Sequence, residues 1–193
     1  KIVMGKLLSS VSMVLLLVVS SLPVISIVFT IGGVGMEDLV QFMLAILVIS
    51  FFIGSMGMLA STVLKKTVPA MVCSMVEVML VCVGTVIIIG VTYIIAKLYY
   101  YNYMGAVGNM PDVSGACLVL LVNPVFTVIQ MTMEQCESVS AISKLAEILN
   151  GSVPAFIEDN WFKISMVSQV VITIILLKMS AFFMKPIKNI HRQ

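Results

Sequence analysis

Long apolar runs dominate the sequence, and four of them are long enough to cross a lipid bilayer. A transmembrane helix needs about 20 mostly apolar residues, because each residue adds about 1.5 Å along the axis and the hydrocarbon layer is about 30 Å thick. The four runs cover residues 7–34, 39–64, 70–96 and 164–184. This pattern predicts an all-α integral membrane protein with four transmembrane helices.

The connection between the third and fourth runs, residues 97–163, is much longer than the other two. Residues 113–133 within it carry no charge. Asn123-Pro124 interrupts this stretch, and proline ends or kinks a helix and restrains the residue before it. A fifth crossing would also move the cationic C-terminal tail to the other side of the membrane. The pattern favours a re-entrant or interfacial helical segment that breaks at Asn123 and Pro124, and a full span through 113–133 is the alternative.

The end of this connection has the pattern of a short amphipathic helix. Val139, Ile142, Ala146 and Leu149 fall on one helical face, and Asn150-Gly151 ends the pattern. We expect this helix to lie on the outer surface of the membrane. Aromatic residues that are typical of the membrane interface flank the connection on both sides: Tyr93, Tyr99, Tyr100, Tyr101, Tyr103 and Trp161.

Lysine and arginine indicate the orientation, because cytoplasmic loops retain them. With the N-terminus inside, seven of the eleven cationic residues fall on the cytoplasmic side and three on the outer side. We therefore expect both termini in the cytoplasm. Residues 1–193 are expected to form a single transmembrane domain.

The composition excludes a water-soluble globular domain. Apolar residues make up 61% of the chain and charged residues 10%, whereas a soluble domain is about 25% charged. The net charge of +2 is too small and too scattered for nucleic-acid binding. The four cysteines have neither CxxC spacing nor a neighbouring histidine, so we predict no metal site.

Two charged residues fall inside the predicted spans. Glu77 lies eight residues after Pro69, about 12 Å, and Lys178 lies seven residues before Lys185, about 10.5 Å. Because an unpaired charge in lipid is costly, we predict a structural ion pair between Glu77 and Lys178. The alternatives are that Lys178 extends to the interface while Glu77 is protonated, or that Glu77 binds a proton or a substrate.

Two further features concern packing and contacts. Ser50, Gly54, Gly57 and Ser61 form a small-residue stripe, which lets another helix of this chain or of a second copy approach closely. Lys65 and Lys66 form a short turn between the second and third runs. They either anchor the topology or contact an ATPase subunit or lipid headgroups.

Several short segments follow one another along the chain in a recognisable order: GKLLSS (5–10), SSLPV (20–24), IGGV (31–34), GSMGMLAS (54–61), KKT (65–67), LVNP (121–124) and KPI (185–187). Their order and spacing resemble the second half of a bacterial type-2 ABC transporter permease. The resemblance covers nearly the whole chain. It implies that the four runs are the third to sixth of six spans, and that two spans and a cytoplasmic coupling helix precede Lys1.

The resemblance also implies a function and partners. Such permeases export a substrate across the bacterial cytoplasmic membrane as dimers, with a second copy or a homologous permease and with ATPase subunits. The chain has no phosphate-binding GxxxxGK[ST] loop, so ATP would bind to a separate subunit and no cofactor is expected in this chain.

Catalysis by the chain itself is not expected. Its single histidine, His191, lies in the tail, which leaves no base for a serine nucleophile within the membrane and no HExxH zinc site. Besides an exporter permease, two other classes fit the sequence. One is a non-transporting membrane scaffold or assembly protein, and the other is an ion-coupled secondary carrier that uses Glu77.

Overall fold

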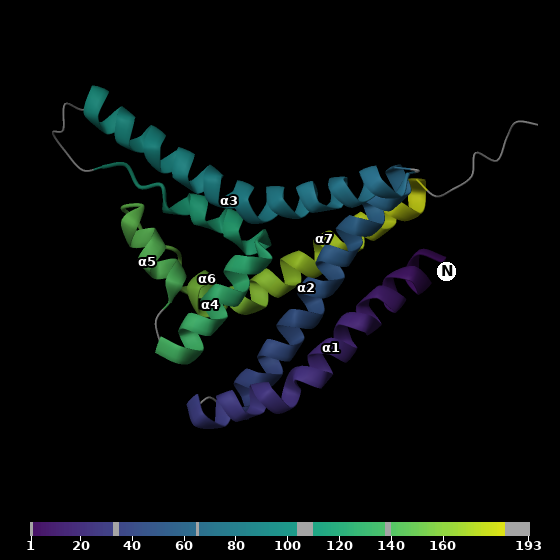
Figure 1. Ribbon diagram of the computed structural model, residues 1–193. Helices are drawn as coiled ribbons and strands as arrows, with labels where there is room; N and C mark the ends of the chain where they lie inside the picture. The colour runs from purple at the N-terminus through teal and green to yellow at the C-terminus, as the bar shows by residue number, and fades with distance from the viewer. Residues whose placement is uncertain (1, 33–34, 65, 104–109, 138–139, 184–193) are drawn as a thin grey trace, which may run out of the picture.

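The computed structural model describes residues 2–32, 35–64, 66–103, 110–137 and 140–183 of the chain. Within these ranges the secondary structure is entirely helical, without a strand. The elements in chain order are α1 (Ile2–Gly32), α2 (Met36–Val63), α3 (Thr67–Tyr103), the 3-10 helix η1 (Ser114–Val122), α4 (Pro124–Glu137), α5 (Ala141–Ile148), α6 (Ala155–Asp159) and α7 (Trp161–Phe183) (Figure 1).

Three of these helices, α2, α3 and α7, are long and apolar enough to cross a membrane. They correspond to the second, third and fourth predicted runs, so the chain is a multi-pass, all-helical membrane protein. The first predicted run also forms one continuous helix, α1, of 31 residues. Its described apolar stretch, Ser12–Ser21, is shorter than a membrane span.

Helix α2 lies at the centre of the bundle and packs against α1, α3 and α7 (Figure 1). It buries side chains on more than one side, among them Phe52, Met56 and Met58. Helix α3, in contrast, leaves much of its apolar surface uncovered by the rest of the chain, and Met79 and Leu80 are each 65% exposed. Uncovered apolar surface of this kind is stable in contact with lipid.

The elements from η1 to α6 (Ser114–Asp159), which we call the insert, fold together at one end of α7. The chain bends by 106° between η1 and α4. Helix α5 then packs on η1 and α4. Ile142, Ala146 and Leu149 are buried, which confirms that they share the apolar face of α5; Val139 lies outside the described residues.

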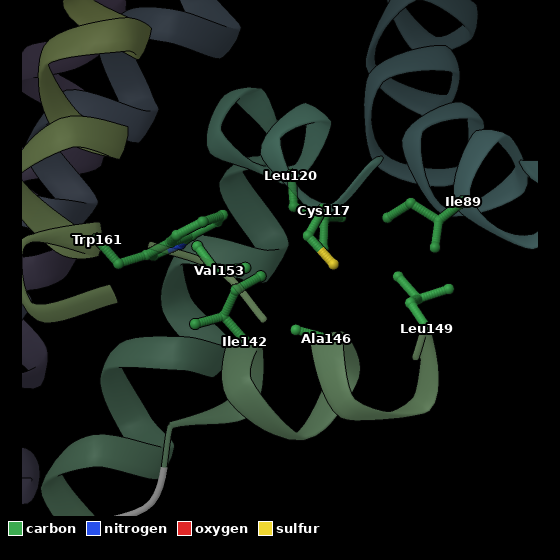
Figure 2. Packing of buried hydrophobic residues seen from close by; sticks show 8 residues of the cluster. All are labelled: Ile89, Cys117, Leu120, Ile142, Ala146, Leu149, Val153 and Trp161. Carbon is green, nitrogen blue, oxygen red and sulfur yellow. The ribbon is translucent and has the colours of Figure 1, made fainter. Parts of the chain in front are cut away.

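The buried face of α5 contributes to the main hydrophobic cluster of the chain (Figure 2). The cluster also contains Cys117 and Leu120 of η1, and Trp161 at the start of α7. Trp161, which the sequence predicts at the membrane interface, has a side chain that is only 1% exposed within the protein. It packs edge-to-face on Phe126, with ring centroids 5.9 Å apart, because the insert folds over the first turn of α7.

Candidate functional site

Asn123 lies at the bend of the insert, where the sequence predicts a break. Its backbone is extended, the conformation favoured before a proline. Pro124 starts α4, where a missing N–H group costs little. The Asn123 Oδ1 atom accepts hydrogen bonds from the backbone N–H groups of Val125 (2.9 Å) and Phe126 (3.2 Å), so this side chain caps α4.

The same side chain joins the bend to α3. Asn123 Nδ2 donates to the backbone oxygen of Cys82 (2.9 Å) and to Oγ1 of Thr85 (2.8 Å). Asn123 is 2% exposed, and its bond to Thr85 is buried. One amide thus holds the bend, the start of α4 and the middle of α3 together.

A second group of polar side chains joins α4 to α7. Thr127 Oγ1 lies 2.5 Å from Ser165 Oγ, and Gln169 Nε2 donates to both hydroxyl oxygens, at 3.0 and 3.2 Å. Ser165 also donates to the backbone oxygen of Leu121, at 2.9 Å. The side chains of Thr127, Ser165 and Gln169 are almost completely buried.

Two buried polar atoms in this region, Gln169 Oε1 and Trp161 Nε1, have no hydrogen-bond partner among the residues that the structure describes. Burial of an unpaired polar group costs about 1–3 kcal/mol. The amide of Gln169 is already oriented by Thr127 and Ser165, so its oxygen faces away from these two hydroxyl groups.

Gln130 joins α4 to α5 in a similar way. Its Oε1 accepts from the backbone N–H of Ile142 (2.9 Å), while Nε2 donates to Ser140 Oγ (3.0 Å) and to Glu134 Oε1 (2.5 Å). Because Gln130 is completely buried, these bonds orient α5 against α4. Buried amides therefore hold the start and the middle of α4.

Helix α7 carries a buried polar stripe that the sequence analysis missed. Ser165, Gln169 and Thr173 recur at every fourth position and are buried, and Ser180 further along is completely buried as well. Ser180 Oγ donates to Thr62 Oγ1 of α2, at 3.3 Å. The spacing of four within an apolar run is the signal that could have found this stripe.

The structure does not bring Glu77 and Lys178 together, which contradicts the predicted ion pair. Glu77 lies on α3 and Lys178 is exposed on α7, and no nitrogen–oxygen distance within 4.0 Å joins these two described side chains. Helices α3 and α7 pack separately on α2 and on η1. The predicted pair also required α3 and α7 to be direct neighbours at these positions.

The contact of Glu77 is within its own helix. Its Oε1 atom accepts a hydrogen bond from the Cys73 thiol one turn earlier, at 3.7 Å. Glu77 is half-buried at the side of α3 that faces α2. No cationic side chain of the described residues lies within ion-pair distance of it.

The predicted small-residue stripe lies partly against a helix of the same chain. A Cβ atom added to Gly57 would lie 4.0 Å from the Cβ atom of Ser74 on α3, so α2 and α3 approach closely there. Ser50 instead lines a small apolar cavity between α1 and α2. Gly54 is half-buried and Ser61 is exposed.

Of the predicted contact residues in the turn before α3, Lys66 is exposed and its backbone oxygen accepts from Ala70 N, at 3.2 Å. Lys65 lies outside the described residues. Among the residues that the structure describes, no group of three or more His, Cys, Asp or Glu side chains could hold a metal ion.

The chain was compared with protein-family models, with curated proteins and with solved structures, and none of the three comparisons found a match.

Proposed function

We propose that the chain is the membrane-spanning permease subunit of an ATP-driven exporter of the type-2 ABC class. In this proposal α1, α2, α3 and α7 cross the bacterial cytoplasmic membrane, both termini are cytoplasmic, and the insert is a re-entrant or interfacial element on the outer side. ATP binds to a separate ATPase subunit. A second copy or a homologous permease completes the translocation path.

The observation that carries this proposal is the insert between α3 and α7. Its bend at Asn123 and its attachment through buried amides to both helices give a compact unit at one end of the bundle. The permeases that the sequence resembles have an outer re-entrant helical pair between their fifth and sixth spans, and the insert would take this place in the chain. The buried bonds suit an element that must keep its shape while the spans around it move.

Energy coupling tests the proposal. The full-length protein is purified together with its candidate ATPase subunit, reconstituted in vesicles and assayed for ATP hydrolysis and export. We expect both activities to be lost when the P-loop lysine of the ATPase is replaced. Export that continues without ATP would refute the proposal.

Topology provides a separate test. Cysteines placed at Lys66 and Asp159, in a chain without its native cysteines, should react with an impermeant thiol reagent from opposite sides of the membrane. Both positions are exposed. Reaction of both from the same side would exclude the four-span arrangement.

An ion-coupled carrier is the second candidate, and one observation favours it. Glu77 lies in a long apolar helix without a cationic partner among the described residues. Carboxylates in such positions are typical of proton and ion pathways. This candidate requires transport that depends on an ion gradient and is lost in Glu77→Gln.

A further inference from the structure

The turn that ends α5 contains Asn150 followed by Gly151. Asn150 has a positive φ of 65°, a conformation that asparagine adopts more readily than most residues. Its side chain is exposed, as are those of its polar neighbours Glu147 and Ser152, so the turn lies at a polar surface of the insert. An asparagine before a glycine is also chemically labile, because glycine has no side chain that would keep its backbone nitrogen away from the asparagine Cγ atom.

Three hydrogen bonds join this turn to the segment that leads into η1. They run from Asn150 Nδ2 to the backbone oxygen of Met110 (2.7 Å), from Val113 N to the backbone oxygen of Leu149 (3.2 Å) and from Ser114 Oγ to the backbone oxygen of Ser152 (3.2 Å). We call these contacts between residues 110–114 and 149–152 the clamp. Leu149 is buried in the main hydrophobic cluster (Figure 2), so the clamp closes the edge of this core.

The clamp and the end of α5 restrain both atoms that react in deamidation. The attacking atom is the Gly151 nitrogen, and its N–H group donates to the backbone oxygen of Ala146, at 3.1 Å. The atom that is attacked is Cγ of Asn150, whose amide is held by Met110. Asp112 restricts the turn further, because its carboxylate occupies the place that a Cβ atom on Gly151 would take. The backbone must therefore leave this arrangement before the two atoms can meet.

We propose that Asn150 is a modification site, at which the chain deamidates when the clamp opens, and that the modification then keeps the clamp open. The Gly151 nitrogen forms a bond to Cγ of Asn150, the bond from Cγ to Nδ2 breaks, and ammonia leaves with the proton of the Gly151 N–H group. Water opens the resulting succinimide ring to aspartate or isoaspartate. The site is independent of the proposed export function, because the reaction requires only water.

Both products lose a contact that belongs to the clamp. A carboxylate at position 150 cannot donate to the backbone oxygen of Met110, so two acceptor oxygens would face each other there. The new negative charge also lies close to Asp112, whose carboxylate packs on Gly151. Isoaspartate lengthens the main chain, which disrupts the bond from Gly151 to Ala146 as well. Altered molecules therefore accumulate with a weakened clamp.

Rates of deamidation test the site in the unaltered protein. The full-length chain in nanodiscs and a free peptide of residues 144–157 are kept at mildly alkaline pH. Conversion at Asn150 is followed by peptide mass spectrometry, with chromatographic separation of isoaspartate. Because local opening limits the reaction in the folded chain, conversion should be at least about tenfold slower than in the peptide, yet faster than at Asn160, which precedes a tryptophan. Equal rates in chain and peptide, or no conversion above that of Asn160, would overturn the proposal.

Two pairs of variants test the role of the clamp. Asp112→Ala frees space over the turn and should speed conversion at least about threefold, whereas Asp159→Ala, which removes an exposed carboxylate on α6, should leave the rate unchanged. The fluorescence of Trp161 verifies that each variant is folded. Asn150→Asp imitates one product and should unfold in mixed micelles at a lower fraction of dodecyl sulfate than Asn102→Asp, which adds the same charge at an exposed position near the end of α3. Equal behaviour within either pair would refute the proposal.

Discussion

Replacing Asn123 with alanine should release the bend of the insert from both α3 and α4. The substitution removes two hydrogen bonds that Nδ2 donates to Cys82 and Thr85, and two that Oδ1 accepts from Val125 and Phe126. The backbone can keep its path, because Pro124 still restrains it. The change therefore reports the contribution of the side chain rather than a change of fold.

The expected loss follows from these contacts. Each buried bond to α3 contributes a net of about 0.5–1.5 kcal/mol, and loss of the cap of a helix costs about 1 kcal/mol. We expect Asn123→Ala to lower the free energy of unfolding by about 2–4 kcal/mol. Asn102→Ala, at an exposed position near the end of α3, should change it by no more than about 0.5 kcal/mol.

The single tryptophan of the chain provides the assay. Trp161 is buried in the cluster that the insert forms with α7, so its fluorescence reports the opening of this region. The protein is unfolded in mixed micelles by increasing the fraction of dodecyl sulfate. If Asn123→Ala and Asn102→Ala unfold at the same fraction as the unaltered chain, the reasoning about the bend is wrong.

Three further outcomes are expected within the insert and can be checked with the same assay. Gly151→Ala should destabilise it by about 1–3 kcal/mol, because a Cβ atom there would overlap the Asp112 carboxylate, whereas Gly115→Ala, which meets no atom within 4 Å, should be close to neutral. The pKa of Asp112 lies below its usual value because its carboxylate accepts a hydrogen bond from the backbone N–H of Ser114. The ionised Asp112 carboxylate therefore stabilises the fold above the unfolded-state pKa, and this contribution is lost as the pH falls through the lower folded-state pKa. Asp112→Asn should reduce the fall in the free energy of unfolding over this acidic range. Ile142→Ala, at a completely buried position, should cost about 2–5 kcal/mol, and an effect below 1 kcal/mol would show that α5 is loosely packed in solution.

The lengths of the apolar runs were sufficient to predict the long helices and their approximate bounds. The proline after Asn123 was sufficient to predict the break in the insert, because a proline restricts the backbone wherever the helix packs. The spacing of Ile142, Ala146 and Leu149 predicted one apolar face for α5. These features are local, since each depends on residues within a few turns of one another.

The neighbours of each helix were decided by the tertiary structure. Membrane helices are apolar on all sides, so their sequence does not show which side meets which helix. The pairing of Glu77 with Lys178 was consistent with their depth, yet α3 and α7 pack separately on α2.

Because the sequence does not show which helices are neighbours, sequence analysis also missed the polar contacts between them. Gln169 and Thr127 lie 42 positions apart, and nothing local links a glutamine in one apolar run with a threonine in another. The bend at Asn123 brings them together, because it turns α4 toward the first three turns of α7. In this chain the sequence determined where helices form and break, and packing around α2 and the bend determined which polar groups meet.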